Sequence, residues 1–240
     1  MASPLEQFQI EPIVPITVGH IDLSFTNSSL WMAISAAAVY ALVMAGTRHH
    51  ALVPGRLQTL VEIAYEFVAE MVRENTGKEG MRFFPAIFTL FMFILTGNFL
   101  GIIPGAFTFT SHIIVTFFMA ICVFLGVTAV GFWMHGVRFL LFFVPPGAPK
   151  LMLPIMVPIE ILSYFFRPVS HSIRLFVNMM AGHTMLKVFA GFIVAMGVFG
   201  VLPLSVNVAL TGFEFIVALL QAYVFTVLTC LYLHDGIHMH

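Results

Sequence analysis

The chain has 240 residues, of which 60% are hydrophobic and 9% charged, and its mean hydropathy is +1.02. Soluble domains are nearer 45 to 50% apolar, so this composition predicts a polytopic membrane protein with room for about five or six spans. The net charge of −1 offers no basic surface for nucleic acid.

Cys122 and Cys230 lie in apolar runs, so no disulfide framework is expected. The first residues do not resemble a cleavable signal peptide, and we expect the first span to insert uncleaved.

The first 82 residues divide sharply by charge. Residues 1–29 contain acids but no Lys or Arg, and the uncharged stretch 30–47 predicts the first span. The following loop holds half of all the lysines and arginines in the chain, namely Arg48, Arg56, Arg73, Lys78 and Arg82. Because positive charge accumulates on the cytoplasmic side of a membrane, the loop is predicted to be cytoplasmic and residues 1–29 external.

Residues 54–76 within this loop have a helical period. Apolar residues recur at i, i+3, i+4 and i+7, and the opposite side carries Glu62, Glu66, Glu70 and Glu74. This pattern predicts an amphipathic helix lying along the cytoplasmic interface of the membrane. The acidic face is either solvated or a docking surface for a cytoplasmic partner, and the sequence leaves both interpretations open.

Residues 83–134 carry no formal charge and are too numerous for one span. Turn residues over 103–111 therefore predict a helical hairpin. Gly97 and Gly101 are spaced so that another helix can approach closely, and Asn98 can hydrogen-bond across that contact. We favour a packing role for these residues over a transport role. His112, at the outer turn, is an interfacial histidine or, alternatively, a ligand.

The last part of the chain contains two long apolar stretches, 151–190 and 204–234. A proline-rich loop with His135, Arg138 and Lys150 precedes them and is predicted to be cytoplasmic. At about 1.5 Å per residue the first stretch reaches about 60 Å, twice the ~30 Å hydrocarbon thickness. It must tilt strongly, kink at its prolines or divide into two elements. Residues 191–203 suit an external turn, so the two stretches form an antiparallel hairpin.

These elements make one all-α transmembrane domain over residues 1–240. It has five membrane-crossing helices and one interfacial amphipathic helix, with the N-terminus outside and the C-terminus in the cytoplasm.

The two long stretches also contain the unusual polar residues, which are Glu160, Ser170, Arg174, Asn178, His183, Glu214 and Gln221. A charge at the centre of a bilayer helix costs about 2.5 to 3.5 kcal/mol on insertion scales, so it is retained where it faces a partner or a water-filled path. An arginine cannot lose its proton to escape burial, and Arg174 is therefore a permanent cation.

The residue numbers predict which of these residues meet. In an antiparallel hairpin, residues at equal height have a constant number sum, and Arg174 with Gln221 and His183 with Glu214 have nearly the same sum. The implied turn falls on Gly197–Gly200. On a straight helix, Ser170, Arg174 and Asn178 lie with Arg167 within about 80° of one another. We therefore expect one polar site shared by two helices.

Arg174 lies between two titratable sites along the predicted helix over 151–190. Glu160 lies about 21 Å toward the cytoplasm, and the His183–Glu214 pair lies about 13 Å toward the outside. This arrangement suits two offset half-routes with a fixed cation between their inner ends. Protons would enter past His183 and Glu214, pass to a carboxylate on a moving partner beside Arg174, and leave near Glu160.

Three blocks of sequence resemble subunit a of F-type ATP synthases. They are SHSIRLFVNMMAGH over 170–183, LQAYVFTVLT over 220–229 and TGNFLGIIPG over 96–105. The resemblance implies a stator subunit against a rotating c-ring, with Arg174 as the essential arginine and the last two helices strongly tilted. It also implies association with the subunit b stalk or its b/b′ equivalent. The order His183 then Glu214 is similar to mitochondrial and alphaproteobacterial members.

The same resemblance implies a subunit of the proton-translocating complex that couples proton-motive force to rotation and ATP synthesis. No Gly-x-x-x-x-Gly-Lys-Ser/Thr motif is present, so we expect no catalytic centre in the chain itself. No cofactor or metal is expected, and the expected location is the bacterial inner membrane rather than the mitochondrial one. The choice between H⁺ and Na⁺ stays open, because the selecting carboxylate belongs to the ring.

Two other classes of protein fit the sequence less well. A secondary transporter with a midplane site usually has two similar halves, and no convincing internal repeat is present. A membrane metalloprotease would use the cluster His234, His238 and His240, but His-Glu-x-x-His does not occur. A frayed C-terminus explains that cluster better.

Overall fold

The computed structural model describes residues 9–15, 17–18, 21–22, 24–48, 55–103, 105–144 and 152–238. Within these ranges, five helical stretches are long and apolar enough to cross a membrane: Asn27–Thr47, Arg56–Ile102, Ile113–Phe143, Leu153–Met196 and Val201–Ile237. The predicted all-α polytopic membrane class is therefore confirmed.

The N-terminal segment contains short strands that the sequence did not predict. β1 (Pro12–Val14) pairs antiparallel with β4 (Phe25–Thr26), and β2 (Thr17–Val18) pairs with β3 (Ile21–Asp22). Helix α1 (Asn27–Thr47) follows directly and begins at Asn27 rather than at residue 30. Its start is capped because the Thr26 hydroxyl accepts a hydrogen bond from the Ser29 amide at 3.3 Å.

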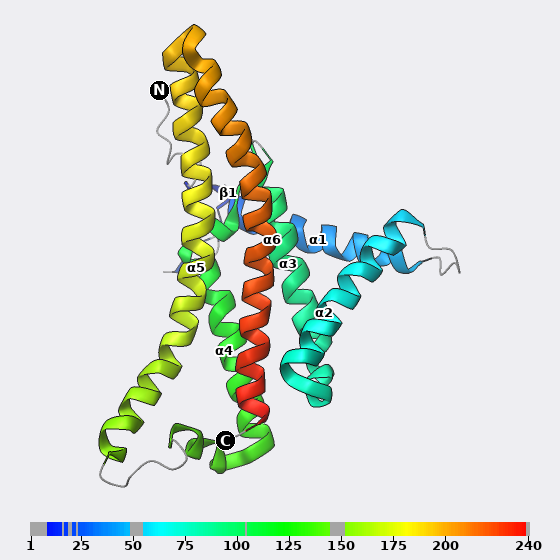
Figure 1. Cartoon of the computed structure of the whole chain (residues 1–240), viewed down its shortest axis with the longest axis vertical. Helices are drawn as coiled ribbons and strands as arrows, with labels where there is room; N and C mark the ends of the chain where they lie inside the picture. The colour runs from blue at the N-terminus through cyan, green and yellow to red at the C-terminus, as the bar shows by residue number, and fades with distance from the viewer. Residues whose placement is uncertain are drawn as a thin grey trace.

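Helix α2 (Arg56–Gly80) is the amphipathic helix expected over 54–76. Val61, Val68 and Val72 are buried on one side, whereas the four glutamates of the acidic face are exposed. The helix is interrupted at Gly77, whose φ of 68° is a conformation that favours glycine. In Figure 1, α1 and α2 lie to one side of the other helices.

The hairpin predicted over 83–134 consists of α3 (Phe84–Ile102) and α4 (Ile113–His135), joined by a turn that contains the 3-10 helix η3 (Phe109–Ser111). A short 3-10 helix, η2 (Met81–Phe83), leads into α3, and another, η4 (Gly136–Phe143), follows α4. The prolines at 145–149 and Lys150 lie outside the described residues.

Side chains from the turn between α3 and α4 pack against two glycines of α3. A side chain added at Gly97 would collide with Phe109, and one added at Gly101 would collide with Thr108. The sequence predicts another helix beside these two glycines, whereas the structure places the turn there. Asn98 does bond across a helix contact, because its Nδ2 donates to the carbonyl of Ala218 at 3.3 Å.

The last two helices form the expected antiparallel hairpin, α5 (Leu153–Met196) and α6 (Val201–Ile237). The 3-10 helix η5 (Gly197–Gly200) joins them, and Gly197 has a φ of 55°. Residues 191–196 and 201–203 are helical, so the external turn predicted over 191–203 is shorter than expected. Although Pro158 and Pro168 lie inside α5, it is one helix, and its first part leans away from α6 (Figure 1).

Helix α6 occupies the centre of the molecule (Figure 1). It packs against α2, α3, α4 and α5, and the core around it includes Val72, Ile94, Val127, Leu175, Phe225 and Cys230. Hydrogen bonds between the hydroxyls of Thr116 and Ser172 at 3.0 Å and of Thr128 and Tyr164 at 2.7 Å attach α4 to α5. The opposite face of α5 is uncovered.

Candidate functional site

Arg174 lies on the uncovered face of α5. Its neighbours on this face, Ser170, Ile173 and Val177, are also exposed. Within the described ranges, no hydrogen bond or ion pair is made by the Arg174 guanidinium. In the described part of the chain, Ser170 bonds only within its helix, where it donates to the carbonyls of Phe166 and Arg167, each at 3.1 Å. The permanent cation therefore has no compensating anion among the described residues.

Gln221 meets Asn178 rather than Arg174. The Asn178 Nδ2 donates to the Gln221 Oε1 at 2.7 Å, and Gln221 is buried in α6. The predicted pairing of Gln221 with Arg174 is thus shifted by about one helical turn. Because the amide of Asn178 occupies the Gln221 oxygen, the guanidinium one turn away stays available to a group outside this chain.

His183 and Glu214 are in contact, as their residue numbers predicted. The His183 Nδ1 and the Glu214 Oε1 are 3.3 Å apart, and both residues are buried. The two atoms are within ion-pair distance but lack hydrogen-bond geometry, and neither Glu214 oxygen has another partner among the described residues. The carboxyl group can therefore still bind water or a proton.

A threonine from the turn of the α3–α4 hairpin completes this pair. The Thr108 hydroxyl donates to the carbonyl of Gly101 at 3.2 Å and lies 3.0 Å from the His183 Nε2. Since its single proton is used on Gly101, the hydroxyl accepts from His183, so Nε2 carries the proton of the neutral ring. The unprotonated Nδ1 then faces Glu214.

Thr108 was not among the residues expected in the site. It lies far from His183 in the sequence, and its position depends on Gly101, because a Cβ there would lie 2.7 Å from the Thr108 hydroxyl oxygen. In the sequence, the pair Gly97 and Gly101 is the only signal for this close approach of the turn, and it predicts a helix contact. These glycines instead position the turn against α5.

A cleft of about 580 Å³ reaches His183 from the N-terminal side of α1. Its polar lining comes from α1, α5, α6 and the turn between α3 and α4: Asn27, Thr108, His183, Lys187 and Asn207. The Asn207 Oδ1 is buried without a partner in the described part of the chain. Because buried polar atoms usually bond to protein or water, this lining fits a hydrated path to the His183–Glu214 pair.

Arg167, two turns before Arg174, has a different environment. Its Nη1 donates to the Asp235 Oδ2 at 2.8 Å, and its guanidinium lies 5.2 Å from the Tyr164 ring and 5.1 Å from the Tyr232 ring. The sequence predicts that Arg167 and Arg174 lie on the same face of the helix. For Asp235, near the end of α6, the sequence predicts only the end of that helix.

The comparisons with known proteins agree with one another. Residues 29–234 match the family described as ATP synthase A chain. The chain belongs to this family. It is 58% identical to ATP synthase subunit a of Parvibaculum lavamentivorans, over 98% of this chain and 94% of the relative. It is 53% identical to the subunit of that name from Paramagnetospirillum magneticum and 53% identical to that from Rhodospirillum rubrum, over 100% of each chain.

Other titratable residues of the chain lie apart from the site. Glu160 is half-buried in the leaning first part of α5 and makes no ion pair with any described residue. His112 stacks on Phe107 with 5.0 Å between ring centroids, and burial lowers the pKa of His112. The rings of His234 and His238 stack at 4.6 Å. His240 lies outside the described residues.

Proposed function

We propose that this chain conducts protons through two offset half-routes to and from a carboxylate of a rotating partner, which docks at Arg174. In this role it is the membrane stator subunit of an ATP synthase, where proton flow drives rotation and ATP synthesis. Its membership of the ATP synthase A chain family supports this function over a secondary transporter. The chain's own residues then bind, orient and relay protons, whereas nucleotide chemistry belongs to the rest of the complex.

The observation that carries the proposal is the uncompensated, exposed guanidinium of Arg174. Its exposed neighbours Ile173 and Val177 are apolar, so this face of α5 meets either lipid or another protein. A cation facing lipid costs about 2.5 to 3.5 kcal/mol or more. A carboxylate on a docked partner offsets that cost, because it supplies the charge and the hydrogen-bond acceptor that the described residues do not provide. A ring of identical subunits, the c-ring, presents such a carboxylate at each step.

The outer half-route begins at the cleft beside α1. Protons reach His183 through the hydrated cleft and pass between the Nδ1 of His183 and the carboxyl group of Glu214. Thr108 supports this relay, because it holds the imidazole with Nδ1 toward Glu214. From Glu214 the path continues along α6 toward Gln221 and Asn178, which lie beside Arg174.

The inner half-route lies on the side of Arg174 that is opposite to His183. Glu160 is the titratable group of α5 toward the opposite end, about 21 Å from Arg174 along the helix. A guanidinium does not release its proton at physiological pH, so Arg174 prevents a proton from passing directly from one route to the other. The proton must instead travel on the partner's carboxylate, and this requirement couples flow to rotation.

The proposal includes an orientation and partners. The N-terminus is placed in the periplasm and the C-terminus in the cytoplasm, because Arg48, Arg56, Arg73, Lys78 and Arg82 share one loop. The membrane is the bacterial inner membrane, the rotating partner is the c-ring, and the stationary partner is the subunit b stalk or its b/b′ equivalent. Ser170 and Asn178 flank Arg174 along the proposed ring-facing surface.

Replacing Arg174 with Ala tests the proposal directly. We expect the complex with Arg174→Ala to assemble but to lose ATP-driven proton pumping in reconstituted vesicles, followed with a pH-sensitive dye. Arg73→Ala is the matched control, because Arg73 is an exposed arginine on the polar side of α2. Normal pumping by assembled Arg174→Ala complexes would refute the proposed role of Arg174.

A further inference from the structure

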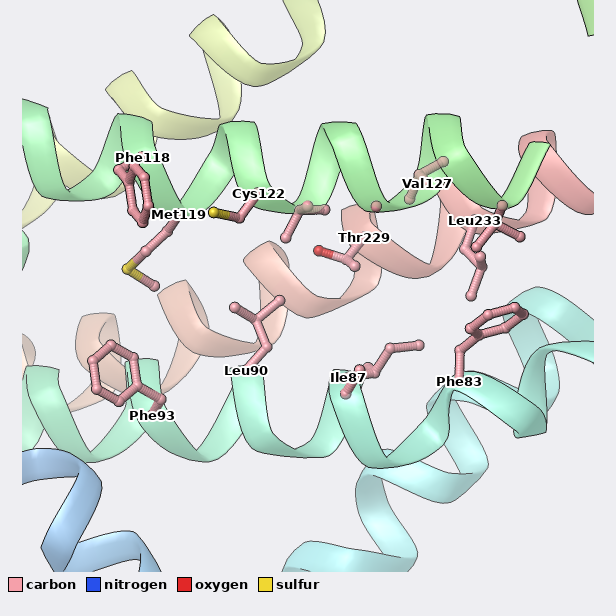
Figure 2. Close-up of a pocket in the computed structure, with 14 residues that line it drawn as sticks. Phe83, Ile87, Leu90, Phe93, Phe118, Met119, Cys122, Val127, Thr229 and Leu233 are labelled. Carbon is pink, nitrogen blue, oxygen red and sulfur yellow. The ribbon is translucent and has the colours of Figure 1, made fainter. Parts of the chain in front are cut away.

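A long apolar groove lies between α3 and α4 and shares no lining residue with the cleft at His183. Its volume is about 380 Å³, and residues such as Leu90, Phe93, Val127 and Leu233 line it. Figure 2 shows these side chains projecting from α3, α4 and α6 into one space, with Phe83 at one end and Phe93 and Phe118 at the other. The Thr229 hydroxyl at the groove donates to its own helix at 2.9 Å, so the lining offers water almost nothing to bind.

A charged cleft of about 520 Å³ adjoins the Phe83 end of this groove. It is lined by Lys78, Glu79, Arg82, Phe83, Trp133 and Met134, and Phe83 belongs to both cavities. The Arg82 guanidinium lies 4.7 Å from the centre of the Trp133 ring. One acid beside two bases leaves the cleft with one net positive charge, next to a tryptophan of the kind that concentrates at membrane interfaces.

The two cavities together have the dimensions of one lipid in one leaflet. From Phe83 to Phe93 the groove follows α3 for about 15 Å, which is half of the ~30 Å hydrocarbon thickness. It starts at a basic cleft on the side that the positive-inside rule places in the cytoplasm. Basic pockets between transmembrane helices on that side bind anionic lipid headgroups.

We propose that this groove holds a phospholipid of the cytoplasmic leaflet with a single negative charge, of the phosphatidylglycerol class. Its phosphate contacts Lys78 and Arg82, its glycerol headgroup lies near Glu79 and Trp133, and an acyl chain fills the groove between α3 and α4. One phosphate neutralises the net positive charge of the cleft. A zwitterionic headgroup would leave that charge in place, so the anionic lipid is the better match. The bound lipid would fix the separation between α3 and α4 and seal both helices against α6.

Photocrosslinking in the whole purified complex tests this site. After detergent washing, the complex is mixed with phosphatidylglycerol vesicles in which one acyl chain carries a diazirine, irradiated and digested, and the labelled peptides are identified by mass spectrometry. We expect label on residues 83–93 and 118–130. Lys78→Gln with Arg82→Gln should reduce that label at least fivefold, whereas the control Arg73→Gln, on α2 but outside the cleft, should leave it unchanged.

A second variant tests the groove independently of the charges. Gly126 lines the groove, and a Cβ there would meet nothing within 4 Å, so Gly126→Leu introduces a side chain where the groove is open. It should also reduce the label, in complexes whose assembly is verified on native gels. The proposal is overturned if all variants label equally, or if phosphatidylethanolamine vesicles label the groove as strongly. It is equally overturned if a bifunctional reagent on Cys122 captures a neighbouring protein helix in place of lipid.

Discussion

The open end and the middle of the α5–α6 hairpin each present an arginine of α5, but the surroundings of the two arginines are opposite. Near the open end, Arg167 is bound to Asp235 at 2.8 Å and lies beside the rings of Tyr164 and Tyr232. In the middle, Arg174 is exposed and has no anion among the described residues. The same side chain, two turns further along one helix, is compensated in one place and left open in the other.

This difference separates a structural role from a functional one. A pair with both charges compensated holds the two helices together and is not free to bind a charged partner. The open guanidinium of Arg174 makes no such contact with the described residues and is available to a partner. The His183–Glu214 pair is intermediate, because its atoms are 3.3 Å apart without hydrogen-bond geometry and can rearrange as a proton moves.

After the loss of pumping expected for Arg174→Ala, the next largest effect is expected from changing the His183–Glu214 pair. His183→Glu alone places two carboxyl groups together, and Glu214→His alone places two imidazoles together, so each should slow ATP-driven pumping by about tenfold or more. Exchanging both residues restores one acid and one base and should recover a larger share of the rate than either single change. Initial pumping rates in vesicles, normalised to assembled complex, measure this. Equal loss in all three variants would show that the two residues do not act as a pair.

The contact between His183 and Glu214 could be predicted because it depends only on helix geometry. Once two apolar stretches are antiparallel and joined at Gly197–Gly200, the height of each residue follows from its number. The same reasoning misjudged Gln221 by about one turn, since α5 bends and a straight-helix count accumulates error along it. The external turn over 191–203 was too long because uncharged, glycine-containing sequence is equally compatible with helix in a membrane.

Other features could not be read from local sequence at all. Thr108 contacts His183 across 75 residues, and nothing in the turn itself distinguishes this threonine from Thr110. The compensation of Arg167 by Asp235 depends on where α6 ends relative to α5, which neither helix encodes alone. The strands before α1 are too short to show the alternation that predicts a strand.

An intermediate effect is expected at the compensated arginine. Arg167→Gln leaves Asp235 without its partner and should lower the stability of the assembled complex by about 1 to 3 kcal/mol, while pumping per intact complex is retained. Thermal unfolding in detergent measures the first quantity and vesicle pumping the second. Arg138→Gln, at an exposed arginine of η4, is the control and should change neither. If Arg167→Gln instead stops pumping without loss of stability, the contrast between the two arginines is wrong.

The smallest effect is expected at Thr108. Thr108→Val keeps the shape of the side chain but removes the hydroxyl that accepts from the His183 Nε2, so the imidazole is no longer held with Nδ1 toward Glu214. Because the relay pair itself is intact, pumping should slow by only about two- to fivefold. Thr108→Ser keeps the hydroxyl and should pump at nearly the normal rate. A normal rate with valine, or an equal loss with serine, would show that the hydroxyl does not orient His183 and that only the packing of Thr108 on Gly101 matters.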